Sequence, residues 1–233
     1  MELLHNGFTL ELCPGAFPLS TDSIALAGFA KLPRKAKAFD LGSGCGTLGL
    51  LLCAQHDDCR VTGIELDEAA HAMALQNSKA NKISNRLTSI CADLRTIPSL
   101  IKPGSFSCCI SNPPYFSGGP ASIHTPVARR DDLCDTDSLM SAAAWGLKFG
   151  GDFFLVHRPE RLAELCACAT KHGLEPKRLQ LLRHRADGPV ALILLQCRKG
   201  ANPGLIWEEE SLHDAEGKPT AYYRKLYHLQ EVT

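Results

Sequence analysis

Asn112-Pro113-Pro114-Tyr115 places an amide side chain, a fixed backbone turn and an aromatic ring next to one another. The lone pair of a planar exocyclic amine is delocalised into its ring, so such an amine is a poor nucleophile. The Asn112 amide oxygen and the Pro113 carbonyl can accept its two N–H bonds and turn the lone pair toward an electrophile. The prolines fix the backbone angle, and Tyr115 can stack on an unpaired base, a contact worth ~1–3 kcal/mol. These residue types suit group transfer to a planar nitrogen, although Asn-Pro turns are also common at strand ends.

A glycine-rich loop, Gly42-Ser43-Gly44-Cys45-Gly46, lies where a predicted strand meets a predicted helix. Glycines allow the backbone to approach a ligand closely, and a helix N-terminus presents unpaired N–H groups. Tight turns of this kind also need glycine for steric reasons alone. A dinucleotide-binding loop would read G-x-G-x-x-G, whereas Thr47 occupies the last of those positions here.

Three acidic residues stand at the ends of successive predicted strands. Asp40 directly precedes the loop, where a carboxylate repels pyrophosphate but can receive the ammonium of an amino-acid ligand. Glu65 closes the second strand and can accept both hydroxyls of a ribose, and Asp93 follows the third strand, where it can accept from an adenine amino group. Together they describe a ligand with an amine, a ribose and an adenine, and we expect Leu66 and Leu94 to contact it as well.

This arrangement resembles the class I S-adenosylmethionine (SAM)-dependent methyltransferases over residues 36 to about 115. The resemblance implies SAM as the cofactor and no metal. Asn-Pro-Pro-Tyr is typical of enzymes that methylate adenine N6, cytosine N4, guanine N2 or a glutamine amide, so the motif indicates the atom type and not the substrate. The implied cofactor-binding residues are Asp40, Gly42, Ser43, Gly44, Gly46, Glu65, Leu66, Asp93, Leu94 and Asn112.

Short apolar runs alternate with helical stretches through the middle of the chain, as in βαβ units. We therefore expect an α/β fold with a Rossmann-like, seven-stranded, mostly parallel sheet that ends in an antiparallel hairpin around a turn at 186–189. Residues 116–134 are predicted to form a long loop, and Ala70, Ala74 and Leu75 to share one face of a helix. The predicted strands are 36–41, 60–65, 87–91, 106–111, 151–157, 174–184 and 190–197, and the predicted helices 20–30, 47–55, 67–81, 135–148 and 159–172.

The first and last thirty-five residues or so do not follow this rhythm. We expect an N-terminal cofactor-covering segment (1–35), a methyltransferase domain (36–200) and a C-terminal tail packed on the same domain (201–233). Formal net charge is zero, so binding to nucleic acid must depend on local patches. The eleven cysteines include no C-x-x-C pair, and neither a leader nor a membrane span is evident. These features indicate a cytoplasmic protein without a structural zinc; the oligomeric state does not follow from them, and we expect a monomer.

A narrower resemblance covers almost the whole chain. Segments 17–23, 126–130, 153–162, 198–200 and 222–227 are similar to the bacterial tRNA1(Val) (adenine(37)-N6)-methyltransferases. This implies methylation of the adenine next to the anticodon, with Asn112 to Tyr115 on the base and the 17–30 segment over the cofactor's methionine end. The chain departs from the family at Arg130-Asp131, where His-Glu is usual, which leaves the role of position 130 open.

RNA contacts would come from basic residues outside the motif. Residues 171–199 carry seven Lys and Arg against two acids, a local charge that suits an RNA backbone but also an ordinary solvated face. His157 and Arg158 could contact phosphates or could simply be polar residues at a strand end, and the sequence does not favour either alternative. The candidate substrate-binding residues are Arg129, Arg183, Arg185, Arg198 and Lys199.

Three rival functions share parts of this pattern. Glutamine N5-methyltransferases of release factors usually carry a separate helical N-terminal domain, and with a first strand near residue 36 we expect none here. Guanine-N2 rRNA methyltransferases usually have Phe as the last residue of the motif, where this chain has Tyr115. A non-catalytic SAM- or RNA-binding module would have no need of Asn112.

Overall fold

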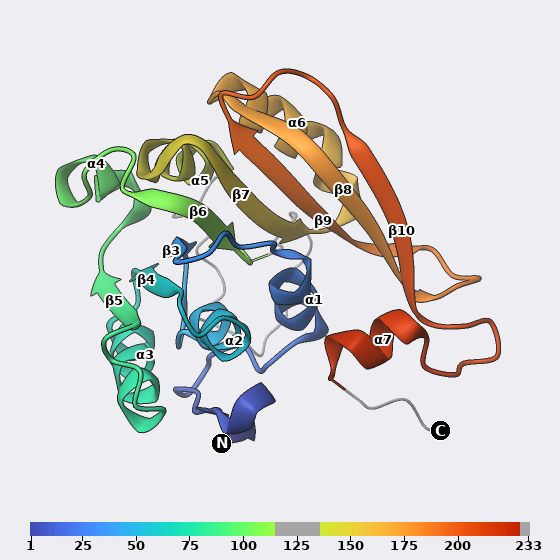
Figure 1. Cartoon of the computed structure of the whole chain (residues 1–233), viewed down its shortest axis with the longest axis horizontal. Coiled ribbons are helices and arrows are strands. Elements are labelled where there is room, and N and C mark those ends of the chain that lie inside the picture. Colours follow the sequence, from blue (N-terminus) through green and yellow to red (C-terminus); the bar gives the residue numbers. More distant parts are fainter. Residues whose placement is uncertain (115–135, 229–233) are drawn as a thin grey trace.

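A twisted eight-stranded sheet runs through the protein between two layers of helices (Figure 1). The computed structural model describes residues 1–114 and 136–228. The strand order is β10-β8-β9-β7-β6-β3-β4-β5, and β9 alone runs against its neighbours. The strands are β3 (Lys37–Leu41), β4 (Arg60–Glu65), β5 (Leu87–Cys91), β6 (Phe106–Ser111), β7 (Leu147–His157), β8 (Leu174–Arg185), β9 (Val190–Lys199) and β10 (Ile206–His213).

Helices α1, α2 and α3 cover one face of the sheet, and α4, α5 and α6 cover the other (Figure 1). A small hairpin of β1 (Glu2–Leu3) and β2 (Thr9–Leu10) precedes them. The remaining elements are α1 (Thr21–Phe29), α2 (Thr47–Gln55), α3 (Glu68–Ala80), α4 (Ile97–Leu100), α5 (Thr136–Gly146), α6 (Leu162–Lys171), α7 (Ala221–Leu226) and the 3-10 turns η1 (His5–Gly7), η2 (Leu94–Thr96) and η4 (Pro159–Arg161).

The sheet separates two hydrophobic cores. Because successive side chains of a strand point to opposite faces, Phe153 packs in the core under α5 and α6 while Phe154 packs in the core under α1 and α2. Phe39 stacks on Phe106 with ring centroids 4.4 Å apart in the first of these cores. Strands buried on both faces read as the continuous apolar runs seen in the sequence.

The parallel strands β3, β4, β5 and β6 all end at the same edge of the sheet, and Asn112 directly follows β6. This carboxyl edge is where open α/β sheets bind ligands. The predicted seven strands are all present and mostly parallel, and β8 and β9 pair antiparallel as expected.

Three element boundaries and one helix face were predicted wrongly. The helix expected to reach residue 148 ends at Gly146, and β7 begins at Leu147 rather than at 151 because Leu147 already pairs with Phe106. The helix expected over 159–172 starts as the separate turn η4. Leu75 is 43% exposed, since it lies about 100° around α3 from the buried Ala74.

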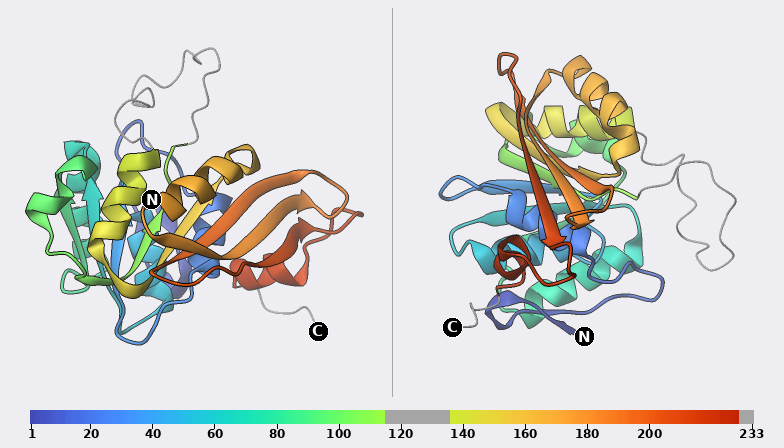
Figure 2. Two further views of the ribbon diagram at one scale, coloured as in Figure 1. Left: turned by 90° about the horizontal axis from the view of Figure 1, so that it is seen from above. Right: turned by 90° about the vertical axis from the view of Figure 1, so that its right-hand side faces the viewer.

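The C-terminal tail contributes an eighth strand that the sequence did not predict. β10 pairs in parallel with β8 and forms the edge of the sheet, so the β8–β9 hairpin is not its end. Ile206 and Trp207 are 67% and 70% exposed, so β10 lacks the alternation that marks a half-buried strand. α7 lies below β10 on the side of α1 (Figure 2). Its Tyr222 hydroxyl accepts a 2.6 Å hydrogen bond from the Gln180 side chain on β8.

Candidate active site

A cavity of about 650 Å³ opens at the carboxyl edge of the sheet. One wall is the glycine loop with the ends of β4, β5 and β6, and the other is an N-terminal stretch over residues 12–23. The volume is typical of small-molecule and cofactor sites. The predicted site residues in its lining are Gly42, Ser43, Gly44, Glu65, Leu66, Asp93, Leu94, Asn112, Pro113 and Pro114.

The glycine loop turns through left-handed backbone angles at alternate positions. Gly42, Gly44 and Gly46 have φ of 72°, 54° and 84°, where side chains with a Cβ are strained. The loop is hydrogen-bonded to β4, because the Gly42 and Ser43 amides donate to the Ile64 carbonyl at 2.9 and 3.0 Å. Gly46 caps α2 and lies outside the cavity lining. The local sterics therefore explain why the motif is G-x-G-x-G.

The Glu65 carboxylate ties the loop to the start of α3. Its Oε2 accepts from the Gly44 amide at 2.7 Å, and its Oε1 accepts from the Asp67 amide at 2.8 Å. An ionised carboxylate offers about four acceptor sites, so these two bonds leave capacity for a pair of hydroxyls. Two roles are thus compatible in one side chain, support of the loop and reception of a diol.

Asp93 and Leu94 form the floor of the cavity beyond β5. Asp93 caps η2 by accepting from the Arg95 amide at 2.8 Å, and both of its oxygens also accept from the Arg95 guanidinium at 3.0 Å. Arg95 lowers the pKa of Asp93 below its ordinary value. The carboxylate at this position is therefore held ionised and fixed in direction.

Asp40 lies behind the loop rather than in the cavity wall. It is 1% exposed, and within the described part of the chain its two oxygens have no hydrogen-bond partner. Burial, with a further contribution from the charge of Glu65, raises the pKa of Asp40 to about 7. In this structure Asp40 is not among the residues that line the cavity, so it offers no direct contact to a ligand ammonium there.

The acidic surroundings match the charge of SAM, which carries a sulfonium and an ammonium. Glu65, Asp67 and Asp93 line the cavity, and the unpartnered Asp40 lies behind it. Among the described residues, the cavity lining contains no Lys or Arg, so a positive ligand meets carboxylates on this side. The residues present therefore fit SAM and not a phosphate-bearing cofactor.

Asn77 on α3 and Asn81 at its C-cap hold the opposite wall, and sequence reasoning missed both. Asn81 accepts from the Thr9 amide at 2.8 Å and donates to the Thr9 carbonyl at 2.7 Å. Asn77 makes the same pair of bonds to Glu11 and also donates to the Cys45 carbonyl at 2.9 Å. Asn77, 2% exposed, thus joins the N-terminal stretch to the glycine loop. The signal was their i, i+4 spacing, which puts both on one helix face.

The structure brings Asn112 against α1. Its side-chain Nδ2 donates to the Ser23 Oγ at 3.0 Å, and Pro113 and Pro114 continue the chain along the cavity. Ser20, Asp22 and Ser23 of the α1 N-terminus line the same cavity. Tyr115 and Arg129 lie outside the described residues.

The four described basic candidates lie in two pairs, one at the carboxyl ends of the parallel strands and one at their amino ends. β8 runs in the same direction as β7, so Arg183 and Arg185 lie at its carboxyl end, on the edge that carries the cavity. Arg183 makes an ion pair of 3.4 Å with Glu209, and Arg185 pairs with Asp187 at 3.1 Å. Such ion pairs near the surface are worth little, but Arg183 also donates to the Gly188 carbonyl at 2.6 Å and Arg185 also donates to the Ala215 carbonyl.

Arg198 and Lys199 lie at the other edge, where the parallel strands begin. Arg198 pairs in the sheet with Asp152 and binds its carboxylate at 2.8 Å. The Lys199 ammonium donates to the carbonyls of Ala144 and Leu147 at 2.5 and 2.7 Å. Both side chains are thus bonded within the fold, away from the cavity.

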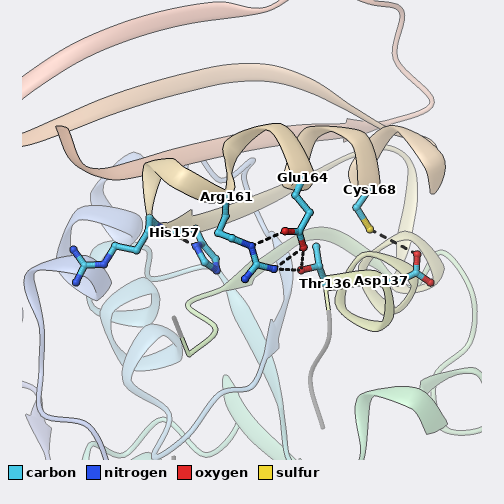
Figure 3. Close-up of polar contacts among 7 residues, drawn as sticks. Thr136, Asp137, His157, Arg161, Glu164 and Cys168 are labelled. Carbon is cyan, nitrogen blue, oxygen red and sulfur yellow. Dashed lines mark hydrogen bonds and ion pairs between the residues drawn. The ribbon is translucent and has the colours of Figure 1, made fainter. Parts of the chain in front are cut away.

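A polar cluster beyond β7 joins α6 to the start of α5 (Figure 3). Arg161 donates to Glu164 at 2.6 Å, and Thr136 donates to the same carboxylate at 3.0 Å. His157 accepts from the Arg158 amide at 2.8 Å. Burial and then the charge of Arg161 lower the pKa of His157 to about 4, so the ring is neutral at pH 7. A neutral ring of this kind does not add charge for a phosphate.

In the ranges that the structure describes, three possible metal ligands come together at Asp137, Cys168 and His172. Asp137 already accepts from Lys171 at 2.6 Å and from His172 at 2.9 Å, and it faces Cys168 across α5 and α6 (Figure 3). The absence of a metal requirement stays a prediction. No helix in the described segments is long and apolar enough to cross a membrane.

The glycine turn after β3, the Glu65 carboxylate at the end of β4 and Asn-Pro-Pro after β6 meet at one cavity on a Rossmann-like sheet. That combination defines a class I methyltransferase with SAM as its cofactor. The chain belongs to the methyltransferase small domain family, which matches residues 22–165.

Within the methyltransferases, this chain is similar to curated relatives of one name. The tRNA1(Val) (adenine(37)-N6)-methyltransferase of Shewanella halifaxensis is 33% identical over 67% of this chain and 64% of its own length, slightly under two thirds of that relative. The protein of the same name from Shewanella sp. strain MR-4 is 31% identical over 75% of each chain. Among solved structures, a predicted O-methyltransferase from Agrobacterium tumefaciens shares the fold with a TM-score of 0.74 and 20% identity, covering 89% of this chain and 96% of its own.

Proposed function

We propose that this protein transfers the methyl group of SAM to the exocyclic N6 amine of an adenine in tRNA, next to the anticodon. The observation that carries the proposal is the position of Asn112 and Pro113 in the same cavity as the glycine loop and Glu65. The names of the curated relatives support adenine N6 and tRNA as the target.

SAM supplies an electrophilic methyl group on a positively charged sulfur. Asn112 Oδ1 and the Pro113 carbonyl each accept one N–H bond of the adenine amine, which directs its lone pair at that carbon. A bond forms from nitrogen to the methyl carbon as the carbon–sulfur bond breaks and its electron pair goes to sulfur. The amine then loses a proton to solvent. Rate comes from alignment and from the carboxylates that surround the shifting charge.

The cofactor site in this proposal consists of the glycine loop, Glu65 on the ribose and Asp93 on the adenine of SAM. Tyr115 is proposed to stack on the target base. For RNA, the geometry favours Arg183 and Arg185, which share an edge with Asn112, over Arg198 and Lys199 on the opposite edge. Arg129 keeps its proposed role in tRNA binding.

We further propose a metal-independent, cytoplasmic monomer with one methyltransferase domain over 36–200. In this division residues 1–35 cover the cofactor, and residues 201–233 are packed on the same domain. The N-terminal stretch in the cavity lining supports the role given to residues 1–35, and the pairing of β10 with β8 supports the packing of residues 201–233 on the same domain.

Asn112 provides the decisive test. Asn112→Ala should leave folding and SAM affinity nearly unchanged and slow single-turnover methyl transfer to tRNA by ~10²–10³-fold, because one preorganised acceptor is lost. Asn112→Asp retains acceptors and should keep partial activity. The assay measures labelled methyl in RNA and protein fractions, then N6-methyladenosine by nucleoside analysis.

The outcomes separate the rival functions. Label in protein would indicate glutamine methylation, N2-methylguanosine would indicate a guanine-N2 enzyme, and SAM binding without transfer would indicate a binding module. A normal rate per folded molecule in Asn112→Ala would refute the catalytic role of Asn112.

A further inference from the structure

Ser23 on α1 contacts the asparagine of the active-site motif. We infer that Ser23 is a positioning residue that orients the Asn112 amide for methyl transfer, an inference that rests on the proposed function. The Ser23 Oγ accepts from Asn112 Nδ2 at 3.0 Å, and both residues line the cavity. Ser23 is 7% exposed, and the bond itself is partly buried.

An asparagine amide has two ends of nearly equal shape and opposite polarity. Only Oδ1 can accept from the target amine, whereas an amide rotated by half a turn would present N–H groups to it. In the structure Nδ2 faces Ser23 and Oδ1 therefore points away from α1, and the bond restrains the amide in this orientation. Such a contact fixes the direction of an acceptor before the substrate binds, which is the basis of electrostatic preorganisation.

Ser23 is itself held in place by the start of α1. The backbone amide of Ser23 donates to the capping Ser20 side chain at 3.4 Å. Two residues earlier, Thr21 bonds the Tyr227 hydroxyl at 3.1 Å, which ties the first turn of α1 to the tail beyond α7. A serine at this site therefore has a firm platform and is not a loosely placed surface hydroxyl.

The rest of α1 is anchored in the core. Ala25, Leu26 and Phe29 are buried, and the Phe29 ring meets the edge of Phe154 from β7 at 6.2 Å. Gly28 lies so close to Leu226 that a Cβ at this position would come within 2.6 Å of it. The helix that carries Ser23 is thus packed against the sheet on one side and against α7 on another. In a segment expected only to cover the cofactor, this assigns a second role to α1.

The test uses the full-length chain, labelled SAM and unmodified tRNA transcripts. Ser23→Ala should slow single-turnover transfer by about 3- to 10-fold, the value of one net hydrogen bond, with SAM affinity unchanged. Ser23→Cys keeps the side-chain size but accepts hydrogen bonds poorly, so it should be slowed similarly and serves if Ser23→Ala folds badly. Ser78→Ala is the matched control, because Ser78 is buried, donates to the Leu87 carbonyl and does not line the cavity.

A double-mutant cycle separates positioning from a structural effect. If Ser23 acts through Asn112, Ser23→Ala should cost nothing further in the Asn112→Ala background. An equal slowing in both backgrounds, or a wild-type rate in both Ser23 variants, would overturn the inference. A normal rate in Asn112→Ala would instead count against the proposed function, so the two failures are distinguishable.

Discussion

Asp40→Asn tests the consequence of burying the Asp40 carboxyl, which is 1% exposed. Its pKa is raised from 3.8 to about 7, first by burial and then by Glu65. A raised pKa in the folded state means that the unfolded chain loses this proton at lower pH. The stability contributed by protonated Asp40 is therefore complete below pH 4 and is lost as pH rises toward 7. Three pKa units correspond to ~4 kcal/mol, an upper estimate.

Asparagine cannot ionise, so the variant should escape this loss. Urea unfolding of the SAM-free proteins should give similar free energies near pH 4 and a growing advantage for Asp40→Asn up to about pH 7. Asp137→Asn is the control, since Lys171 lowers the pKa of that exposed carboxyl to about 2, which reverses the sign. A difference between wild type and Asp40→Asn that is constant from pH 4 to 8 would refute the argument.

Three further predictions concern the two walls and the RNA. Glu65→Ala should weaken SAM binding by about tenfold or more in calorimetry, because a charged acceptor is lost on both the loop and the ribose; unchanged affinity would contradict the cofactor site. Replacing Arg183 and Arg185 by Gln should weaken tRNA binding and flatten its salt dependence with SAM affinity intact; an unchanged salt slope would place RNA elsewhere. Asn77→Ala should lower the unfolding free energy by ~1–3 kcal/mol and weaken SAM binding, since the buried Asn77 side chain loses three hydrogen bonds; a loss of stability with normal SAM affinity would show that the N-terminal wall does not contribute to cofactor binding.

The cofactor side of the cavity was predictable because its determinants are local. Three glycines at alternate positions require a turn with positive φ, and acids at the ends of parallel strands must meet at one edge. Asp40 was the exception, since sequence position placed it at that edge but did not reveal that the loop would cover it. Whether a strand-end carboxylate faces the cavity or lies behind its wall depends on the path of the next residues.

The outer elements were harder to predict because little of their surface is buried. β10 presents exposed Ile206 and Trp207 followed by acids, so no periodic pattern marks it as a strand. Its pairing partner β8 lies earlier in the chain and offers a free edge once the β8–β9 hairpin has formed. Backbone hydrogen bonds, which carry no sequence signal, thus decide its structure.

Contacts between distant segments determine the other wall of the cavity. Ser23 meets Asn112, Asn77 meets Glu11 and Cys45, and none of these pairs follows from spacing along the chain. The glycine loop and α1 should therefore respond differently to substitution. Changes in the glycine loop or Glu65 act on a ligand bound in the ground state and should appear in SAM affinity. Changes in α1 act on the direction of one acceptor, which matters only as the new bond forms, and should appear in the rate.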